Sequence, residues 1–250
     1  MAFDSKIGKL AVETFDGLLL AVAPEHLEEY IPPSSEVGGF DVTWPADEGE
    51  FLGFAPQVMQ CLRENSYCKV QMYLSDVPSS LAMEESKSLD FTRLKKELAL
   101  AFLGRSNESK VCWMARVPET DTQAPPALQT CDQLLGSLCK MIQPLTAPAL
   151  DFTADCQTHC MVRMPLGEHS NLERESVTQD DIEEGLIDSH ISFCRRRRLC
   201  FMLVIESSGA DLTLYPQDPE KPQVHLSVEK GQLIVFDHAQ CSYEYRPSSS

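Results

Sequence analysis

The part of the chain that follows residue 199 constrains the fold most. Short apolar runs alternate there with turn residues, as in the steps SSGAD (207–211) and KG (230–231). Runs of about four to eight β-favouring residues between turn signals are typical of antiparallel sheets that close into a barrel or jelly roll. The sequence therefore predicts strands over 199–206, 211–215, 223–228, 232–236 and 242–246.

The part before residue 199 mixes helical and strand patterns. Apolar side chains recur at helical spacing in the segment 128–142, which predicts a helix with one buried face. This stripe consists of Leu128, Cys131, Leu135, Leu138 and Ile142. The sequence shows no internal repeat and no obvious linker. We therefore expect a single α+β domain over 1–250, with an N-terminal α/β part over 1–127 and a β-rich part over 128–250.

The chain is strongly acidic, with 21 Lys and Arg against 38 Asp and Glu and a formal net charge of −17. Such a surface repels phosphate backbones and anionic membranes, which argues against general binding of nucleic acid or membrane. Acidic residues flank the short apolar run near the N-terminus on both sides. This pattern predicts neither a signal peptide nor a membrane span, so we expect an intracellular protein.

Ten cysteines are scattered through apolar segments, and none forms a C-x-x-C pair. Because nothing in the sequence indicates secretion, we interpret them as reduced thiols that act as small apolar side chains. A structural zinc site is the alternative hypothesis.

The segment from about 128 to 250 resembles the prolyl-4-hydroxylase type of Fe(II)- and 2-oxoglutarate-dependent oxygenase. The matching features are Arg198 at the start of a long apolar strand, the step SGADLTLYP, and the Gly-x-Leu-x-x-Phe strand from Gly231 to Phe236. In this family a His-x-Asp pair ends the strand before that arginine, and a distal histidine follows the last of these strands. The resemblance implies a double-stranded β-helix, or jelly roll, in the C-terminal half, with flanking helices from the N-terminal half.

Aligned in this way, the chain departs from the family at the metal ligands. His190 takes the first ligand position, but Ser192 replaces the carboxylate and Tyr243 replaces the distal histidine. Such enzymes hold Fe(II) with two histidines and one carboxylate, and a neutral hydroxyl does not balance the ferrous charge as a carboxylate does. The alignment therefore implies a degenerate site with no catalytic residue and no bound cofactor.

A second alignment supports an active enzyme. It places His169 with Asn171 in the first two positions and His238 in the distal one, and it still lacks a carboxylate. The basic residue that binds 2-oxoglutarate in the family would fall just past Ser250. In this alternative the chain is a prolyl-hydroxylase-like dioxygenase with an atypical ligand set, and Fe(II) and 2-oxoglutarate are its cofactors.

Four consecutive arginines, Arg195, Arg196, Arg197 and Arg198, form the only basic cluster of this acidic chain. We interpret them as a solvated lead-in to the following strand that pairs with the acidic helix around Asp180–Glu184. The alternatives are a docking patch for an acidic partner, such as a phosphopantetheine-bearing carrier domain, and a nuclear signal. A nuclear signal is disfavoured because the arginines lie within folded β structure.

The segment Asp47–Gly53 partly resembles the E-x-x-E-x-G-Y-L-G motif that precedes the ketosynthase in dinoflagellate polyketide synthases. The matching positions are Glu48, Phe51 (for Tyr), Leu52 and Gly53, and the departures are Pro45 and Glu50. This resemblance implies a docking or structural module at the N-terminus of a polyketide- or fatty-acid-type synthase, in the cytoplasm or the plastid stroma. Our hypothesis is therefore a non-catalytic module whose partner is a ketosynthase or carrier domain, with the active oxygenase as the alternative.

Overall fold

The computed structural model describes residues 2–4, 9–13, 19–22, 39–44, 53–72, 79–105, 109–114, 126–166, 173–207 and 209–247. Its helices are α2 (Phe54–Asn65), α3 (Ser79–Ser86), α4 (Lys96–Leu103), α5 (Ala127–Leu150), α6 (Gln179–Glu183) and α7 (Leu186–Arg196). Its strands are β1 (Ala2–Asp4), β2 (Lys9–Glu13), β3 (Leu19–Val22), β4 (Val42–Trp44), β5 (Tyr67–Met72), β6 (Ser109–Trp113), β7 (Met161–Pro165), β8 (Leu199–Leu203), β9 (Ala210–Pro216), β10 (Val224–Val228), β11 (Gln232–Asp237) and β12 (Cys241–Pro247). A search of these described residues finds no helix that combines the length and the apolar character needed to cross a membrane.

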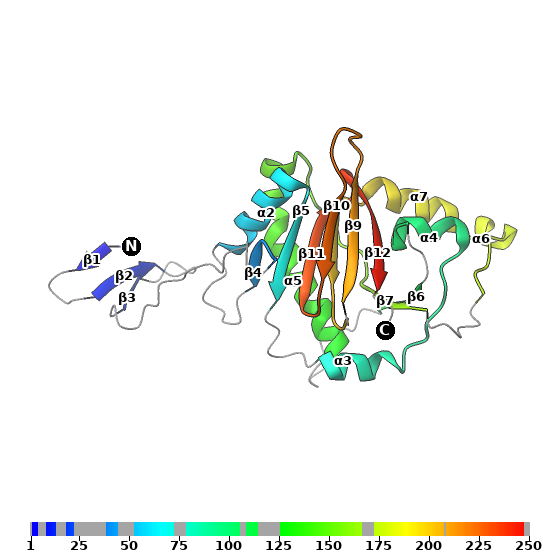
Figure 1. Cartoon of the computed structure of the whole chain (residues 1–250), viewed down its shortest axis with the longest axis horizontal. Coiled ribbons are helices and arrows are strands. Elements are labelled where there is room, and N and C mark those ends of the chain that lie inside the picture. Colours follow the sequence, from blue (N-terminus) through cyan, green and yellow to red (C-terminus); the bar gives the residue numbers. More distant parts are fainter. Residues whose placement is uncertain are drawn as a thin grey trace.

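Two sheets form the centre of the structure (Figure 1). The first has the strand order β4–β5–β11–β8, and the second has the order β10–β9–β12. Every strand pair in them is antiparallel except β4 with β5. Strands β8 to β12 confirm the five strands expected after residue 199, although β8 already ends at Leu203.

Strand β11 is buried on both faces and connects two parts of the core. Because successive side chains of a strand point to opposite faces, Ile234 and Phe236 pack between the two sheets, whereas Leu233 and Val235 face helices. The cluster between the sheets also contains Leu212, Leu214, Val228 and Tyr243. The two sheets therefore form a sandwich, and this mixture of helices and antiparallel sheets confirms the expected α+β class.

Helices α2 and α5 cover the outer face of the four-stranded sheet (Figure 1). The whole apolar stripe expected for 128–142 is buried, and α5 continues beyond it through Pro144 and Pro148 to Leu150. Strand β5, from the first half of the sequence, pairs with β11 from the second half, so both halves contribute to one sheet. The division of the chain at residue 127 stays a prediction.

The segment before β8 is helical. Helix α7 contains Arg195 and Arg196 in its last turn and ends before Arg197, so only Arg197 and Arg198 lead directly into β8. The acidic helix α6 begins with a capping box between Thr178 and Asp181. Asp181 pairs with Lys95, at 3.0 Å between carboxylate and ammonium. Among the described residues no ion pair joins the arginine run to α6, and that expected pairing is wrong.

Candidate functional site

Tyr243 of β12, which the alignment places in the distal-histidine position, points into the space between the two sheets. It is 3% exposed, and its ring centroid lies 5.2 Å from that of Phe236 and 5.7 Å from that of His238. Its hydroxyl donates a hydrogen bond of 2.6 Å to the carbonyl oxygen of Phe102. Burial raises the pKa of Tyr243, so the phenol stays protonated at neutral pH.

The C-terminal end of α4 approaches this tyrosine closely. The backbone N–H of Arg105 donates a hydrogen bond of 2.8 Å to the carbonyl oxygen of Tyr243. Gly104, the C-cap of α4, has φ = +72°, and a Cβ atom at this position would clash with the same carbonyl oxygen. A glycine is therefore required where α4 meets β12.

Arg163 of β7 is a partly buried cation beside Tyr243 that the sequence pattern alone did not predict. Its guanidinium donates hydrogen bonds to Ser109 Oγ at 2.9 Å and to the carbonyl oxygen of Leu103 at 3.1 Å, and it lies over the ring of Tyr245 at 5.0 Å. Burial lowers the pKa of Arg163, and interactions with Tyr243 and Tyr245 oppose this shift. An arginine between the apolar residues of MVRMP was the available signal, because such a residue is expensive to bury unless it has partners.

His238 follows β11 and packs against both Phe236 and Tyr243. Burial, with a further contribution from the positive charge of Arg197, lowers the pKa of His238 to about 4. Arg197 itself turns toward the protein and donates a hydrogen bond to the carbonyl oxygen of Ala101 in α4. His238 is therefore neutral at physiological pH and lies in a region of positive potential.

His190 and Ser192 lie on helix α7, not at the end of a strand. The His190 ring contacts Phe102, with 5.6 Å between centroids, and its Nε2 lies 3.5 Å from Cys194 Sγ. Burial, followed by the charge of Arg197, lowers the pKa of His190. Phe102 therefore lies between His190 and Tyr243, because its ring contacts the histidine and its carbonyl oxygen accepts a hydrogen bond from the tyrosine hydroxyl. The described contacts of Ser192 lie within α7, where its carbonyl oxygen accepts from Arg196 Nε at 3.4 Å.

The strand that precedes β8 is β7, and it ends in Met164 and Pro165, with Leu166 next. The family places its His-x-Asp pair at the end of that strand, so these residues supply neither an imidazole nor a carboxylate there. His169 and Asn171, the alternative ligands, lie outside the described residues.

The described residues around Tyr243 do not fit Fe(II). They offer one suitable donor, the neutral imidazole of His238, beside a protonated phenol and two arginine side chains, whereas a facial Fe(II) site needs two histidines and a carboxylate. Only one group of three His, Cys, Asp or Glu side chains converges within the described part of the chain, and it lies elsewhere, at Asp41, Cys61 and Cys68. The described residues at this site therefore lack the ligands that would hold Fe(II).

Three members of the arginine run face solvent. Arg195, Arg196 and Arg198 are exposed, and the guanidinium of Arg198 lies 5.6 Å above the ring of Phe152. The fourth, Arg197, is the one that faces His190 and His238. The run therefore divides into two parts. Arg195, Arg196 and Arg198 form a basic surface at the end of α7, whereas Arg197 points toward the protein interior.

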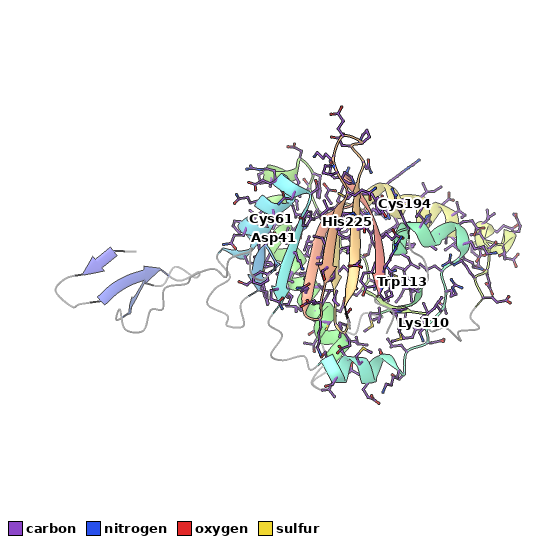
Figure 2. The ribbon with its side chains drawn as sticks, viewed as in Figure 1. Asp41, Cys61, Lys110, Trp113, Cys194 and His225 are labelled. Carbon is purple, nitrogen blue, oxygen red and sulfur yellow. The ribbon has the colours of Figure 1, made fainter. Side chains whose placement is uncertain are left out.

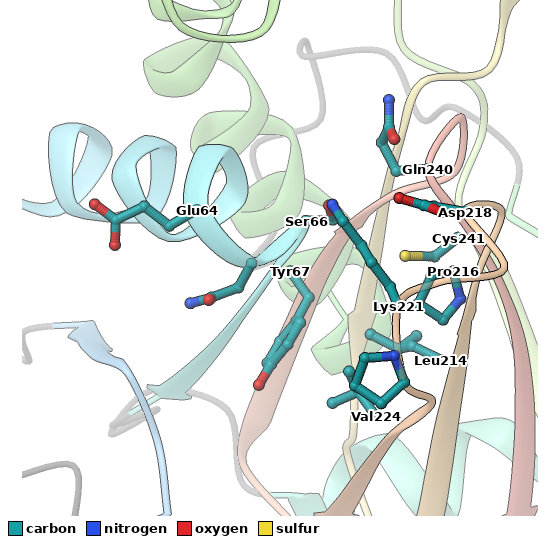
Figure 3. Close-up of a pocket in the computed structure, with 12 residues that line it drawn as sticks. Glu64, Ser66, Tyr67, Leu214, Pro216, Asp218, Lys221, Val224, Gln240 and Cys241 are labelled. Atoms are coloured by element: carbon teal, nitrogen blue, oxygen red, sulfur yellow. The ribbon is translucent and has the colours of Figure 1, made fainter.

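A pocket of about 170 Å³ lies at a different place, between the end of α2 and the loop that joins β9 to β10 (Figure 3). Tyr67, Leu214, Lys221 and Cys241 are among the residues that line it. Neither His190, His238 nor Tyr243 contributes to this lining. The pocket is therefore distinct from the cluster around Tyr243.

Comparisons with known proteins find similarity in structure alone. No protein-family model and no curated protein matches the sequence. The structure is similar to a prolyl hydroxylase from Trichoplax adhaerens solved with a hypoxia-inducible-factor peptide, at 17% identity and a TM-score of 0.50 over 77% of this chain and 82% of that one. It is also similar to a prolyl-4-hydroxylase from Pseudomonas putida, at 14% identity and a TM-score of 0.46 over 78% and 93% of the two chains. A 2-oxoglutarate–Fe(II) oxygenase from Burkholderia pseudomallei follows, at 14% identity and a TM-score of 0.43 over 83% and 90%. The first of these comparisons establishes that the chain has a prolyl-hydroxylase-like fold.

Proposed function

We propose that this chain is a non-catalytic domain with an oxygenase fold, built on a double-stranded β-helix, that acts as a binding module. The observation that carries the proposal is that buried Tyr243 occupies the position where the alignment expects a metal-binding histidine, with the partly buried guanidinium of Arg163 beside it. A guanidinium repels Fe(II), and Tyr243 uses its hydroxyl proton to bind the carbonyl of Phe102.

The basic surface at the end of α7 is the candidate contact for a partner. Arg195, Arg196 and Arg198 are exposed on a chain whose net charge is −17, so an acidic partner would be attracted to this end of the molecule. The more specific assignment to a polyketide- or fatty-acid-type synthase, with a ketosynthase or carrier domain as partner, depends on the motif resemblance at 45–53. Most of that segment lies outside the described residues, and the structural comparisons do not bear on it.

The second candidate is an active Fe(II)- and 2-oxoglutarate-dependent oxygenase. The structural comparison favours it over the polyketide-synthase role, because the similar structure from Trichoplax adhaerens is a prolyl hydroxylase. Two histidines also lie in this region, His190 against Phe102 and His238 against Tyr243. This candidate requires a carboxylate and a further ligand from outside the described residues, such as His169 from the segment 167–172.

Anaerobic titration with Fe(II) and 2-oxoglutarate distinguishes the two candidates. We expect no visible charge-transfer band and no consumption of 2-oxoglutarate by the unmodified protein, with an established prolyl hydroxylase as the positive control. Stoichiometric Fe(II) binding at micromolar levels together with turnover would replace the first candidate by the second.

A paired set of variants tests the physical reason. Arg163→Asp with Tyr243→His removes the cation of Arg163, places a histidine at position 243 beside His238, and adds a carboxylate on the neighbouring strand β7, so Fe(II) binding should rise above that of the parent. Ser192→Asp with Tyr243→His is the matched control and should give no gain, because Ser192 lies on α7. Equal gains in both variants would contradict the assignment of Arg163.

A further inference from the structure

A second group of donor side chains lies on the opposite, helix-covered face of the four-stranded sheet. Asp41 Oδ, Cys61 Sγ and Cys68 Sγ all lie within 4.8 Å of one another. They come from three separate segments, since Asp41 directly precedes β4, Cys61 lies on α2 and Cys68 lies on β5. Asp41 and Cys61 are adjacent in Figure 2. We propose that these three side chains form a binding site for a thiolate-preferring divalent cation of the Zn²⁺ class.

The donor types favour zinc over the cations that oxygen ligands select. Thiolates bind Zn²⁺ and other soft or borderline metals, whereas Mg²⁺ and Ca²⁺ prefer oxygen. Sites with three protein ligands leave a fourth tetrahedral position for water or another ligand. Here Cys68 is fully buried, Cys61 is partly buried and Asp41 is exposed, so the open position would face solvent on the Asp41 side.

The backbone holds the carboxylate in place without a metal. The N–H of Lys69 donates a hydrogen bond of 2.8 Å to Asp41 Oδ2, and the N–H of Asp41 donates one of 2.7 Å to the carbonyl oxygen of Lys69. Hydrogen bonds of this kind orient the ligands of metal sites and tune their affinity. Lys69 does not bring its ammonium group to the site, because its Nζ donates to the carbonyl oxygen of Ser227 at 2.6 Å.

The charges around Cys61 also suit a cation. Cys68 donates a hydrogen bond to Cys61, which lowers the pKa of the Cys61 thiol, while the negative charges of Asp41 and Glu64 oppose that shift. The two sulfur atoms lie within 4.8 Å of each other. A divalent cation would replace the proton of that hydrogen bond and would neutralise the surrounding acidic groups.

Titration of the reduced, metal-free protein with Co²⁺ as a spectroscopic probe tests the site. We expect one Co²⁺ per chain, a thiolate-to-metal charge-transfer band in the near ultraviolet, tetrahedral visible bands, and full displacement by one equivalent of Zn²⁺. Cys61→Ser should abolish the charge-transfer band at stoichiometric Co²⁺. Asp41→Asn removes a proposed ligand and should weaken binding by at least about 10- to 100-fold, which is the loss already found when groups that only support the ligands are removed.

Cys156→Ser is the matched control, because Cys156 is an exposed thiol outside the proposed site. It should leave the stoichiometry and the spectrum unchanged. Circular dichroism of each variant shows whether it has folded, and only folded variants enter the comparison. The absence of the band in the reduced parent, its survival in Cys61→Ser, or its loss in Cys156→Ser would overturn the proposal. All of these outcomes are independent of Fe(II) binding or 2-oxoglutarate turnover, so they do not depend on the proposed function.

Discussion

The two faces of the four-stranded sheet differ in what their polar side chains can bind. Between the sheets, where the alignment expects metal ligands, Tyr243 and His238 lie near the cations of Arg163 and Arg197. On the helix-covered face, Asp41, Cys61 and Cys68 bring an anion and two thiols together. The face that the fold predicts to hold a metal carries positive charge, and the opposite face carries the donors. A fold therefore does not guarantee the donor set of its family, and the site has to be argued from the side chains.

Replacement of Phe236 by alanine tests the largest energetic contribution of the inner face. Phe236 is fully buried between the sheets, so its truncation removes apolar contacts and leaves a cavity. We expect Phe236→Ala to lower the free energy of unfolding by about 3–5 kcal/mol in urea denaturation. Leu138→Ala is the matched change on the helix-covered face and should cost about 2–5 kcal/mol, since Leu138 is also fully buried. A loss below about 1 kcal/mol for Phe236→Ala would contradict a packed interior.

The half-buried, neutral His238 predicts loss of stability in acid. Its pKa falls from an unfolded value near 6.5 to about 4 in the folded protein, so the unfolded state binds more protons between these pH values. The free energy of unfolding keeps the full contribution of neutral His238 above pH 6.5. It decreases by about 3 kcal/mol as the pH falls to about 4. The His238→Gln variant has no titratable group at this position, so its free energy of unfolding should depend less on pH over that window. Identical pH profiles for parent and variant would contradict a depressed pKa.

Tyr243→Phe tests the smaller contribution of one hydroxyl. The change leaves the carbonyl oxygen of Phe102 without its donor in a buried place, and we expect a loss of about 1–3 kcal/mol in unfolding free energy. Tyr215→Phe is the control, because Tyr215 donates a hydrogen bond of 2.6 Å to Glu244 nearer the surface. Its loss should be smaller, and a larger loss for Tyr215→Phe than for Tyr243→Phe would reverse the expected order.

The sequence was sufficient to predict the helices and strands that depend on local patterns. The alternation of apolar and turn residues predicted the strands from β8 to β12, and the stripe from Leu128 to Ile142 predicted most of α5. Gly104 closes α4, as a glycine after a helical pattern suggests, but its contact with Tyr243 depends on a strand far away in the sequence. Such contacts between distant segments carry no local signal.

The candidate site was harder to predict for the same reason. Alignment by spacing placed His190 and Ser192 in ligand positions, yet residues 186–196 form a helix. Arg163 escaped notice because its role depends on Tyr243, which lies 80 residues later in the chain and on another strand. Asp41, Cys61 and Cys68 belong to no spacing motif, and only the packing of α2 on β4 and β5 brings them together.

Crystals of the reduced protein soaked with Co²⁺ would compare both faces of the sheet in a single experiment. An anomalous difference map at the cobalt edge should show one peak between Asp41, Cys61 and Cys68, and no peak beside Tyr243 and His238. A peak near His238 and Tyr243 with none at the thiol group would contradict the account, because it would place the metal site on the face that we describe as cationic.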